Sequence, residues 1–244
     1  MLEQTVAGAK AALATFVNPE KQAFFPKFFK AGPGQYGEGD IFLGVTVPNV
    51  REVAKQFAGL TEAEVYELMQ SPIHEHRLLA LIIMVGKWKK ANSAKSSAPS
   101  AQQELFDLYL RLVYEGRVNN WDLVDATAPY LGAYLVETNN TELLGELAKS
   151  NDLWLNRMSA IFTFAFLKEG IIEPTLWMAE FHLDNKHDLM HKACGWMLRE
   201  MGKNYPKALN SFLEQHSTKM PRTMLRYAIE KLPEGQRKAW LTKK

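Results

Sequence analysis

Apolar residues recur along the chain with the three- and four-residue spacing of amphipathic helices. Residues 50–60 follow this spacing, as do residues 105–113 and 154–165. Alternation with a period of two is scarce, and no Asn-Gly or Asp-Gly pair marks a hairpin turn. The pattern therefore predicts an all-α chain of about a dozen helices.

Capping and turn residues divide these helices from one another. Asn18 precedes Pro19, a pairing typical of a helix N-terminus, and Thr61 and Thr141 each stand before an early glutamate. Three glycines that follow apolar runs predict helix ends, namely Gly116, Gly170 and Gly202.

The predicted helices fall into pairs that repeat every 35–40 residues or so, roughly the period of HEAT-like repeats. The sequence therefore predicts an α-solenoid of stacked antiparallel helix pairs. We expect a single domain over residues 1–244, with a flexible loop at residues 91–103, which are rich in alanine and serine. Such a stack curves, and its inner face forms a groove that suits a nucleic acid or a protein ligand.

Charge is unevenly distributed, although the formal net charge is only +2. Residues 186–244 contain 13 lysines and arginines against 5 acidic residues, a local charge of +8, which leaves −6 for the rest of the chain. A basic region of this kind can attract a polyanion, although a basic tail that only aids solubility has the same composition.

Two further features bear on location. The single cysteine, Cys194, cannot form an internal disulfide, which fits a reducing compartment. The N-terminus lacks the basic and apolar regions of a signal peptide, and the most apolar stretch, residues 78–85, is far shorter than the roughly 20 residues of a membrane span. We therefore expect a cytoplasmic protein without membrane contact.

Familiar catalytic and metal-binding motifs are missing from the sequence. It has no P-loop, no dinucleotide-binding glycine motif, no HExxH and no CxxC pair. His74 and His76 are two residues apart and so face different sides of a helix, whereas His187 and His191 share a face without an acidic or cysteine partner in register. We therefore expect no metal and no cofactor, with the second histidine pair at the surface or facing phosphates.

One segment places chemistry-bearing residues at helical spacing. Trp121 and Asp125 are four residues apart, so on a helix they lie on one face, one turn from each other. Asp122 follows two asparagines, where a carboxylate caps a helix N-terminus. The segment taken alone also fits a core tryptophan, a helix cap and a surface acid.

Two later segments add to this set. Arg157 follows an apolar helix start, where an inward-facing arginine needs an anionic partner, and Trp196 follows Gly195 inside a predicted helix. Glycine within a helix costs roughly 1 kcal/mol relative to alanine, which is tolerable where another backbone must approach closely. Two tryptophans, a carboxylate and arginines together indicate a cleft for a cationic or sugar-like group beside a phosphate backbone.

Four short stretches carry a resemblance that covers nearly all of the chain. They are residues 42–48 (FLGVTVP), 121–125 (WDLVD), 153–157 (LWLNR) and 195–200 (GWMLRE). In this order they resemble the AlkD-like DNA alkylation repair glycosylases, which are built from HEAT-like, armadillo-type repeats.

The resemblance implies a monofunctional glycosylase that hydrolyses the N-glycosidic bond of N3- or N7-alkylated purines in double-stranded DNA. It implies that Asp125 is the catalytic aspartate and that Trp121 and Trp196 are the aromatic pair that flanks the sugar-phosphate of the lesion. Arg157 corresponds to the arginine near the phosphate backbone, and Arg199 is expected to be a second phosphate contact. We expect a monomer. The alternative is a non-catalytic HEAT-like scaffold that binds structured DNA or a protein partner.

The sequence departs from the family pattern near its N-terminus. Phe28 stands where a tyrosine is expected, and Thr46 stands where a polar amide is expected. Both positions bear on the fit of the strand opposite the lesion and on lesion preference.

Overall fold

The computed structural model describes residues 4–93 and 98–243. Within these ranges the chain forms fifteen α-helices and no strand, apart from an isolated bridge between Ile41 and Ile73. The prediction of an all-α fold is confirmed. Contacts divide the chain into two compact units, Met1–Thr127 and Ala128–Lys244.

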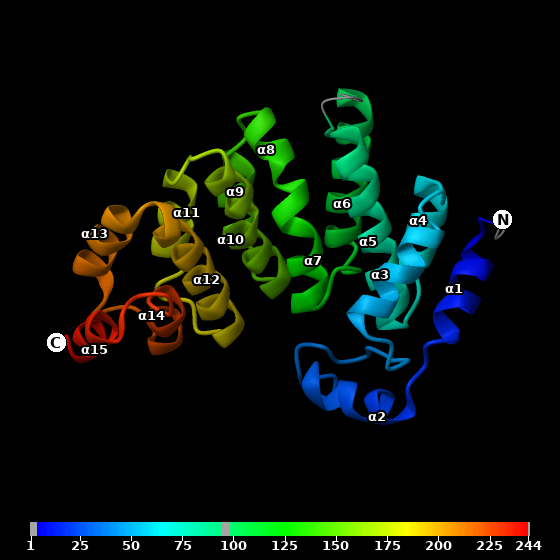
Figure 1. Cartoon of the computed structure of the whole chain (residues 1–244), viewed down its shortest axis with the longest axis horizontal. Helices are drawn as coiled ribbons and strands as arrows, with labels where there is room; N and C mark the ends of the chain where they lie inside the picture. The colour runs from blue at the N-terminus through cyan, green and yellow to red at the C-terminus, as the bar shows by residue number, and fades with distance from the viewer. Residues whose placement is uncertain (1–3, 94–97, 244) are drawn as a thin grey trace. The chain divides into compact units, whose positions relative to one another are not determined.

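The first unit contains six helices and the start of a seventh. These are α1 (Val6–Ala14), α2 (Pro19–Phe28), α3 (Val47–Gln56), α4 (Glu62–Met69), α5 (His74–Ala91), α6 (Pro99–Tyr114) and α7 (Trp121–Leu131). From α3 onward the helices pack in succession, because α3 and α4 contact α5, and α4 and α5 contact α6 (Figure 1). This neighbour-to-neighbour packing is that of an α-solenoid.

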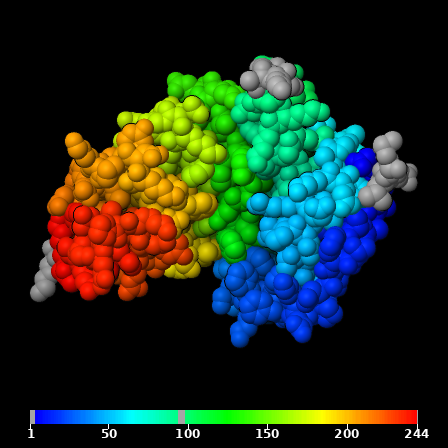
Figure 2. All heavy atoms as spheres, in the orientation of Figure 1, coloured from blue at the N-terminus to red at the C-terminus, as the bar shows by residue number. Residues whose placement is uncertain are grey.

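The second unit repeats the same pattern. Its helices are α8 (Ala133–Glu137), α9 (Glu142–Ala148), α10 (Leu153–Lys168), α11 (Glu173–Phe181), α12 (Asp188–Asn204), α13 (Pro206–His216), α14 (Arg222–Ala228) and α15 (Glu234–Thr242). Helices α9 to α12 each contact the next one or two along the chain, and α12 packs on α13 and α14. In the space-filling view the atoms of these helices form a continuous surface, coloured from green to red along the chain (Figure 2).

The capping predictions are confirmed at two of three helices. The Asn18 side chain accepts a hydrogen bond from the Lys21 N–H at 3.0 Å, and Thr61 forms a reciprocal capping box with Glu64. Thr141 makes no side-chain cap. The carboxamide oxygen of the preceding Asn140 accepts from the α9 backbone instead.

Two of the three glycines that were predicted to end helices do so, and the third does not. Gly116 and Gly170 follow α6 and α10 with φ of 69° and 80°, the left-handed backbone that favours glycine, and so confirm the predicted helix ends. Gly202 is different, because it lies inside α12 and is packed against the Leu209 side chain. Its prediction as a helix end is wrong.

The break between α5 and α6 is shorter than the predicted loop at residues 91–103. Helix α5 ends at Ala91 and α6 begins at Pro99, so residues 99–103 are helical. Residues 94–97 lie outside the described residues. The single domain and the flexible loop stay predictions. Across the two described ranges, we find no helix with the length and hydropathy that a bilayer crossing needs.

Candidate active site

Helix α7 carries two of the predicted site residues. Trp121 is its first residue and Asp125 lies one turn later, and both are half-buried. The Trp121 ring stacks on Phe29, with centroids 5.6 Å and planes 20° apart, and Phe28 meets it edge-on at 6.0 Å. The indole is thus held by an aromatic wall on one side while part of it stays open to solvent.

Asp125 lies near a buried hydroxyl pair. The Tyr109 and Thr127 hydroxyls are 2.7 Å apart. Burial raises the pKa of Tyr109, and the negative charge of Asp125 raises it further. The phenol therefore stays protonated beside the carboxylate at neutral pH.

Asp122 is not the helix cap that the sequence predicts. Asn120 precedes the helix, and its carbonyl accepts from the Val124 N–H while its side-chain oxygen accepts from the Trp121 N–H at 2.9 Å. The Asp122 carboxylate is buried, and its Oδ2 accepts a hydrogen bond from His74 Nε2 at 2.9 Å.

His74, the first residue of α5, is the centre of a buried polar network. Its Nδ1 donates to Asp40 Oδ2 at 3.0 Å, and its Nε2 donates to Asp122. The other Asp40 oxygen accepts from Arg77 Nη2 at 2.5 Å and from Asn119 Nδ2 at 3.1 Å. The network joins α5, the loop before α3 and the start of α7.

The charges in this network compensate one another. Burial alone lowers the pKa of His74, but the carboxylates of Asp122 and Asp40 outweigh it and raise the pKa to about 9. Burial tends to raise the pKa of Asp40, but hydrogen bonding from His74 and the charge of Arg77 hold it below its usual value. At neutral pH the imidazolium and the guanidinium therefore face two carboxylates.

The 42–48 stretch is anchored by another buried carboxylate. Glu75 Oε1 accepts hydrogen bonds from the backbone N–H groups of Leu43, Gly44 and Val45 at 2.8–3.1 Å. Gly44 has φ of 80°, a conformation that permits this turn. Because Glu75 directly follows His74, these hydrogen bonds fix the backbone of residues 43–45 beside the His74 network.

Sequence reasoning missed His74, Asp40, Arg77 and Asn119. A usable signal was present, because four consecutive polar residues at 74–77 directly precede the apolar stretch of residues 78–85. The structure buries all four. The two-residue spacing of His74 and His76 argues against a metal pair but does not indicate a partner for His74.

His76 belongs to a different environment. Its Nδ1 lies 2.9 Å from Ser71 Oγ. Burial lowers its pKa to about 4, with further lowering by the charges of Lys10 and Arg77. His76 is therefore neutral where His74 is charged. Among the described residues, no group of three or more His, Cys, Asp or Glu side chains is arranged to hold a metal ion.

The second unit contains Arg157 and Trp196 on adjacent helices. Arg157 on α10 is buried, and its Nη1 donates to the Leu189 carbonyl at the start of α12 at 2.5 Å. Trp196 on α12 is half-buried, with its ring 6.3 Å from that of Phe164. The glycine before it is explained by packing: a Cβ on Gly195 would lie 2.5 Å from the Met224 carbonyl oxygen, so the predicted close backbone approach is confirmed.

Arg199 is engaged by acidic side chains. Its Nη1 pairs with Glu230, and its Nε lies 3.5 Å from Glu200. Hydrogen bonding to Arg199 lowers the pKa of the Glu230 carboxyl. A phosphate at Arg199 would have to compete with both carboxylates.

The predicted site residues therefore fall into two sets. Trp121 and Asp125 belong to the first unit, and Arg157, Trp196 and Arg199 belong to the second. The convergence of the two sets on one cleft stays a prediction.

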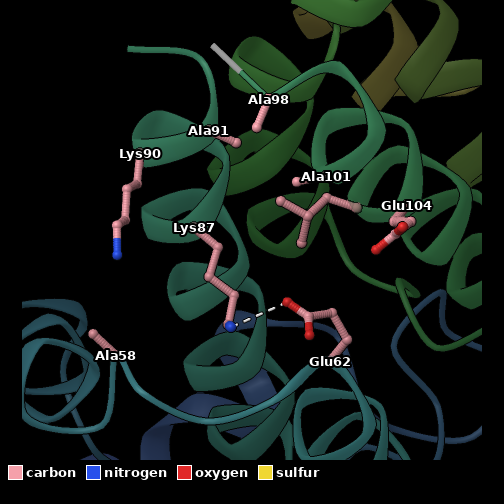
Figure 3. A pocket seen from close by; sticks show the side chains of 9 residues that line it. Ala58, Glu62, Lys87, Lys90, Ala91, Ala98, Ala101 and Glu104 are labelled. Carbon is pink, nitrogen blue, oxygen red and sulfur yellow. Dashed lines mark hydrogen bonds and ion pairs between the residues drawn. The ribbon is translucent and has the colours of Figure 1, made fainter. Parts of the chain in front are cut away.

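Two surface pockets lie apart from α7. In the second unit a polar pocket of about 400 Å³ forms where α10 and α12 begin, and Asn156, Lys186 and His187 are among its lining residues. In the first unit a pocket of about 300 Å³ lies beside the end of α5 and contains the Lys87–Glu62 ion pair, with N and O atoms 3.1 Å apart (Figure 3). None of the predicted site residues lines either pocket.

Comparison with known proteins decides the family. Residues 9–232 match the family described as DNA alkylation repair enzyme. The chain belongs to this family. No curated protein matches the chain.

The fold of this family member is similar to a solved structure, a predicted DNA alkylation repair enzyme from Enterococcus faecalis. The TM-score is 0.63 and the sequence identity 16%, with 89% of this chain and 97% of that chain covered. The likeness supports the fold, and the family match assigns the protein to the repair of alkylated DNA.

Proposed function

We propose that this protein is a monofunctional DNA glycosylase that hydrolyses the N-glycosidic bond of N3- and N7-alkylated purines in double-stranded DNA. The observation that carries the proposal is the placement of Trp121 and Asp125 one turn apart on α7, both half-buried, in a member of the DNA alkylation repair family. We further propose that it acts as a monomer.

The chemistry of the substrate needs few groups from the protein. An N3- or N7-alkylated purine is cationic, so its glycosidic bond is weakened and the base leaves as a neutral molecule. The remaining sugar is oxocarbenium-like, and the Asp125 carboxylate stabilises that charge and orients the attacking water. A general acid and a lysine nucleophile are both unnecessary, which gives hydrolysis without strand cleavage.

Aromatic faces suit the cationic lesion. The indoles of Trp121 and Trp196 each contribute a cation–π attraction of about 0.5–2 kcal/mol. Stacking on Phe29 holds the Trp121 ring in place. Phe28 adds an apolar edge beside it, without the hydroxyl that a tyrosine would offer.

Phosphate contacts come from the second unit. Arg157 and the basic residues of 186–244 supply positive charge, and Lys186 and His187 line a polar pocket at the start of two helices. Arg157 is buried and donates to the Leu189 carbonyl, and Arg199 is paired with Glu230 and close to Glu200. We therefore assign the direct phosphate contacts mainly to the exposed lysines and arginines of 186–244, with Arg157 acting through its charge.

Incubation of the purified protein with methylated double-stranded DNA tests the proposal. We expect free 3-methyladenine or 7-methylguanine in the supernatant, with strand breaks only after alkaline treatment. Strand cleavage without alkali would show a lyase activity instead. Tight DNA binding without base release would favour the non-catalytic scaffold.

A further inference from the structure

Three segments that are distant in the sequence meet at His74. Its two ring nitrogens bond to Asp40, in the loop before α3, and to Asp122, in the first turn of α7, at 3.0 and 2.9 Å. The imidazole ring also lies 4.9 Å from the rings of Phe29 and Phe42. His74 therefore holds both the polar and the aromatic neighbours of the α7 start.

The same groups reach Trp121 by two routes. Asn120 Nδ2 donates to Asp40 Oδ2 at 3.3 Å, while the Asn120 side-chain oxygen accepts from the Trp121 backbone N–H. Through the aromatic route, Phe29 contacts both the His74 ring and the stacked Trp121 ring. Two routes of contact therefore connect His74 to Trp121, one ending at its backbone N–H and the other at its ring.

The positive charge of the His74 ring is compensated by the carboxylates on either side of it. The groups that face it are Asp122 from α7 and Asp40 from the loop, and Arg77 on its own helix neutralises the second Asp40 oxygen. The other Asp122 oxygen, Oδ1, is buried without a hydrogen-bond partner among the described residues. Loss of the imidazolium would leave the Asp122 carboxylate without the cation that its burial requires.

We propose that His74 is a positioning residue of the active site, which as an imidazolium between Asp40 and Asp122 fixes the orientation of Trp121 and Asp125 at the start of α7. The inference rests on the proposed function for the roles of Trp121 and Asp125. It adds a residue that touches neither substrate nor reacting atoms and acts through the α7 backbone and the Phe29 ring.

A merely structural role would give a different pattern. A residue that only stabilises the first unit would lower its thermal stability without moving Trp121 in the folded protein. A positioning residue changes the environment of Trp121 and the turnover rate while the protein stays folded.

The experiment compares His74→Gln with His76→Gln, the same change two residues along the same helix at a neutral histidine outside the network. The protein is labelled with 5-fluorotryptophan, and the Trp121 resonance is assigned by its loss in Trp121→Phe. Single-turnover base release and its dependence on DNA concentration are measured well below the melting temperature of each variant.

For His74→Gln we expect a shifted or broadened Trp121 fluorine resonance and a fall of at least tenfold in the maximal rate, with DNA affinity changed by less than threefold. His76→Gln should change neither the Trp121 resonance nor the maximal rate. In His74→Gln/Asp122→Asn a neutral amide pair replaces the ion pair, so we expect a partial return of the rate.

An unmoved Trp121 resonance in folded His74→Gln, an unchanged maximal rate beside an active wild type, or an equal effect of His76→Gln would overturn the proposal. If His74→Gln does not fold, Asp122→Asn alone supplies the same two readouts, with the same interpretation. If the wild type releases no base, the proposed function fails, but the fluorine signal still decides whether His74 orients Trp121.

Discussion

His74 Nε2 donates to Asp122 Oδ2 over 2.9 Å and so joins the first residue of α5 to the first turn of α7 across 48 positions of sequence. Apolar packing is non-directional and would allow α7 to rotate or slide. A charge-assisted hydrogen bond has a defined geometry, so this pair selects one register for the helix that carries Trp121 and Asp125.

The His74 ion pairs predict a pH-dependent stability. The folded pKa of about 9 lies above the ordinary value of 6.5, so the contribution is fully present below pH 6.5 and is lost as the pH rises through about 9. The difference between these two pKa values corresponds to a contribution of about 3 kcal/mol to the free energy of unfolding. Urea unfolding between pH 6 and pH 10 measures it.

The same titration of two variants isolates the histidine. The free energy of unfolding of His74→Gln should vary less over this range than that of the wild type. His76→Gln should run parallel to the wild type above about pH 7.5, where the His76 imidazole is neutral in both the folded and the unfolded chain. Parallel curves for the wild type and His74→Gln would show that the imidazolium contributes no such stability.

Gly195 predicts a cost of crowding between α12 and α14. A Cβ at this position would meet the Met224 carbonyl oxygen and the Tyr227 Cβ at 2.5 Å, so Gly195→Ala should destabilise the protein by about 1–3 kcal/mol. Gly86→Ala is the control, because Gly86 lies in α5 with nothing within 4 Å of an added Cβ. It should stabilise by about 0.4–1 kcal/mol in the same denaturation series. Equal effects of the two changes would refute the close approach.

Much of this structure is readable from the sequence because it depends on local patterns. Apolar spacing predicts the helices, Asn18 and Thr61 predict helix starts, and Gly195 predicts a close backbone approach. The role of Asp122 was not predictable in this way, because its partner His74 is 48 residues earlier. A carboxylate in a first helical turn has the same local sequence whether it caps the helix or forms a buried ion pair.

The Trp121 indole predicts a measurable share of catalysis. If its face attracts the cationic base by about 0.5–2 kcal/mol, Trp121→Ala should slow base release by about 2- to 30-fold. Trp177→Ala is a suitable comparison, since Trp177 is an exposed tryptophan on α11. Its rate of base release should stay at the wild-type level. A Trp121→Ala rate equal to that of the wild type would remove the indole from the mechanism.

Phosphate contacts predict a steep dependence of DNA affinity on salt. Each phosphate neutralised by a lysine or arginine contributes about −0.9 to the slope of log affinity against log salt. Binding of undamaged duplex should therefore weaken strongly between low and physiological salt, as fluorescence anisotropy can measure. A flat dependence would contradict binding through the basic residues of 186–244.

The central claim is that Asp125 supports cleavage of the glycosidic bond, and single-turnover release of 7-methylguanine from methylated duplex DNA tests it most directly. Asp107→Asn is the matched control, because it makes the same chemical change at an exposed carboxylate on α6. We predict that Asp125→Asn abolishes release while the fold and DNA binding persist, and that Asp107→Asn releases base at the wild-type rate. Release by Asp125→Asn at the wild-type rate would contradict the account.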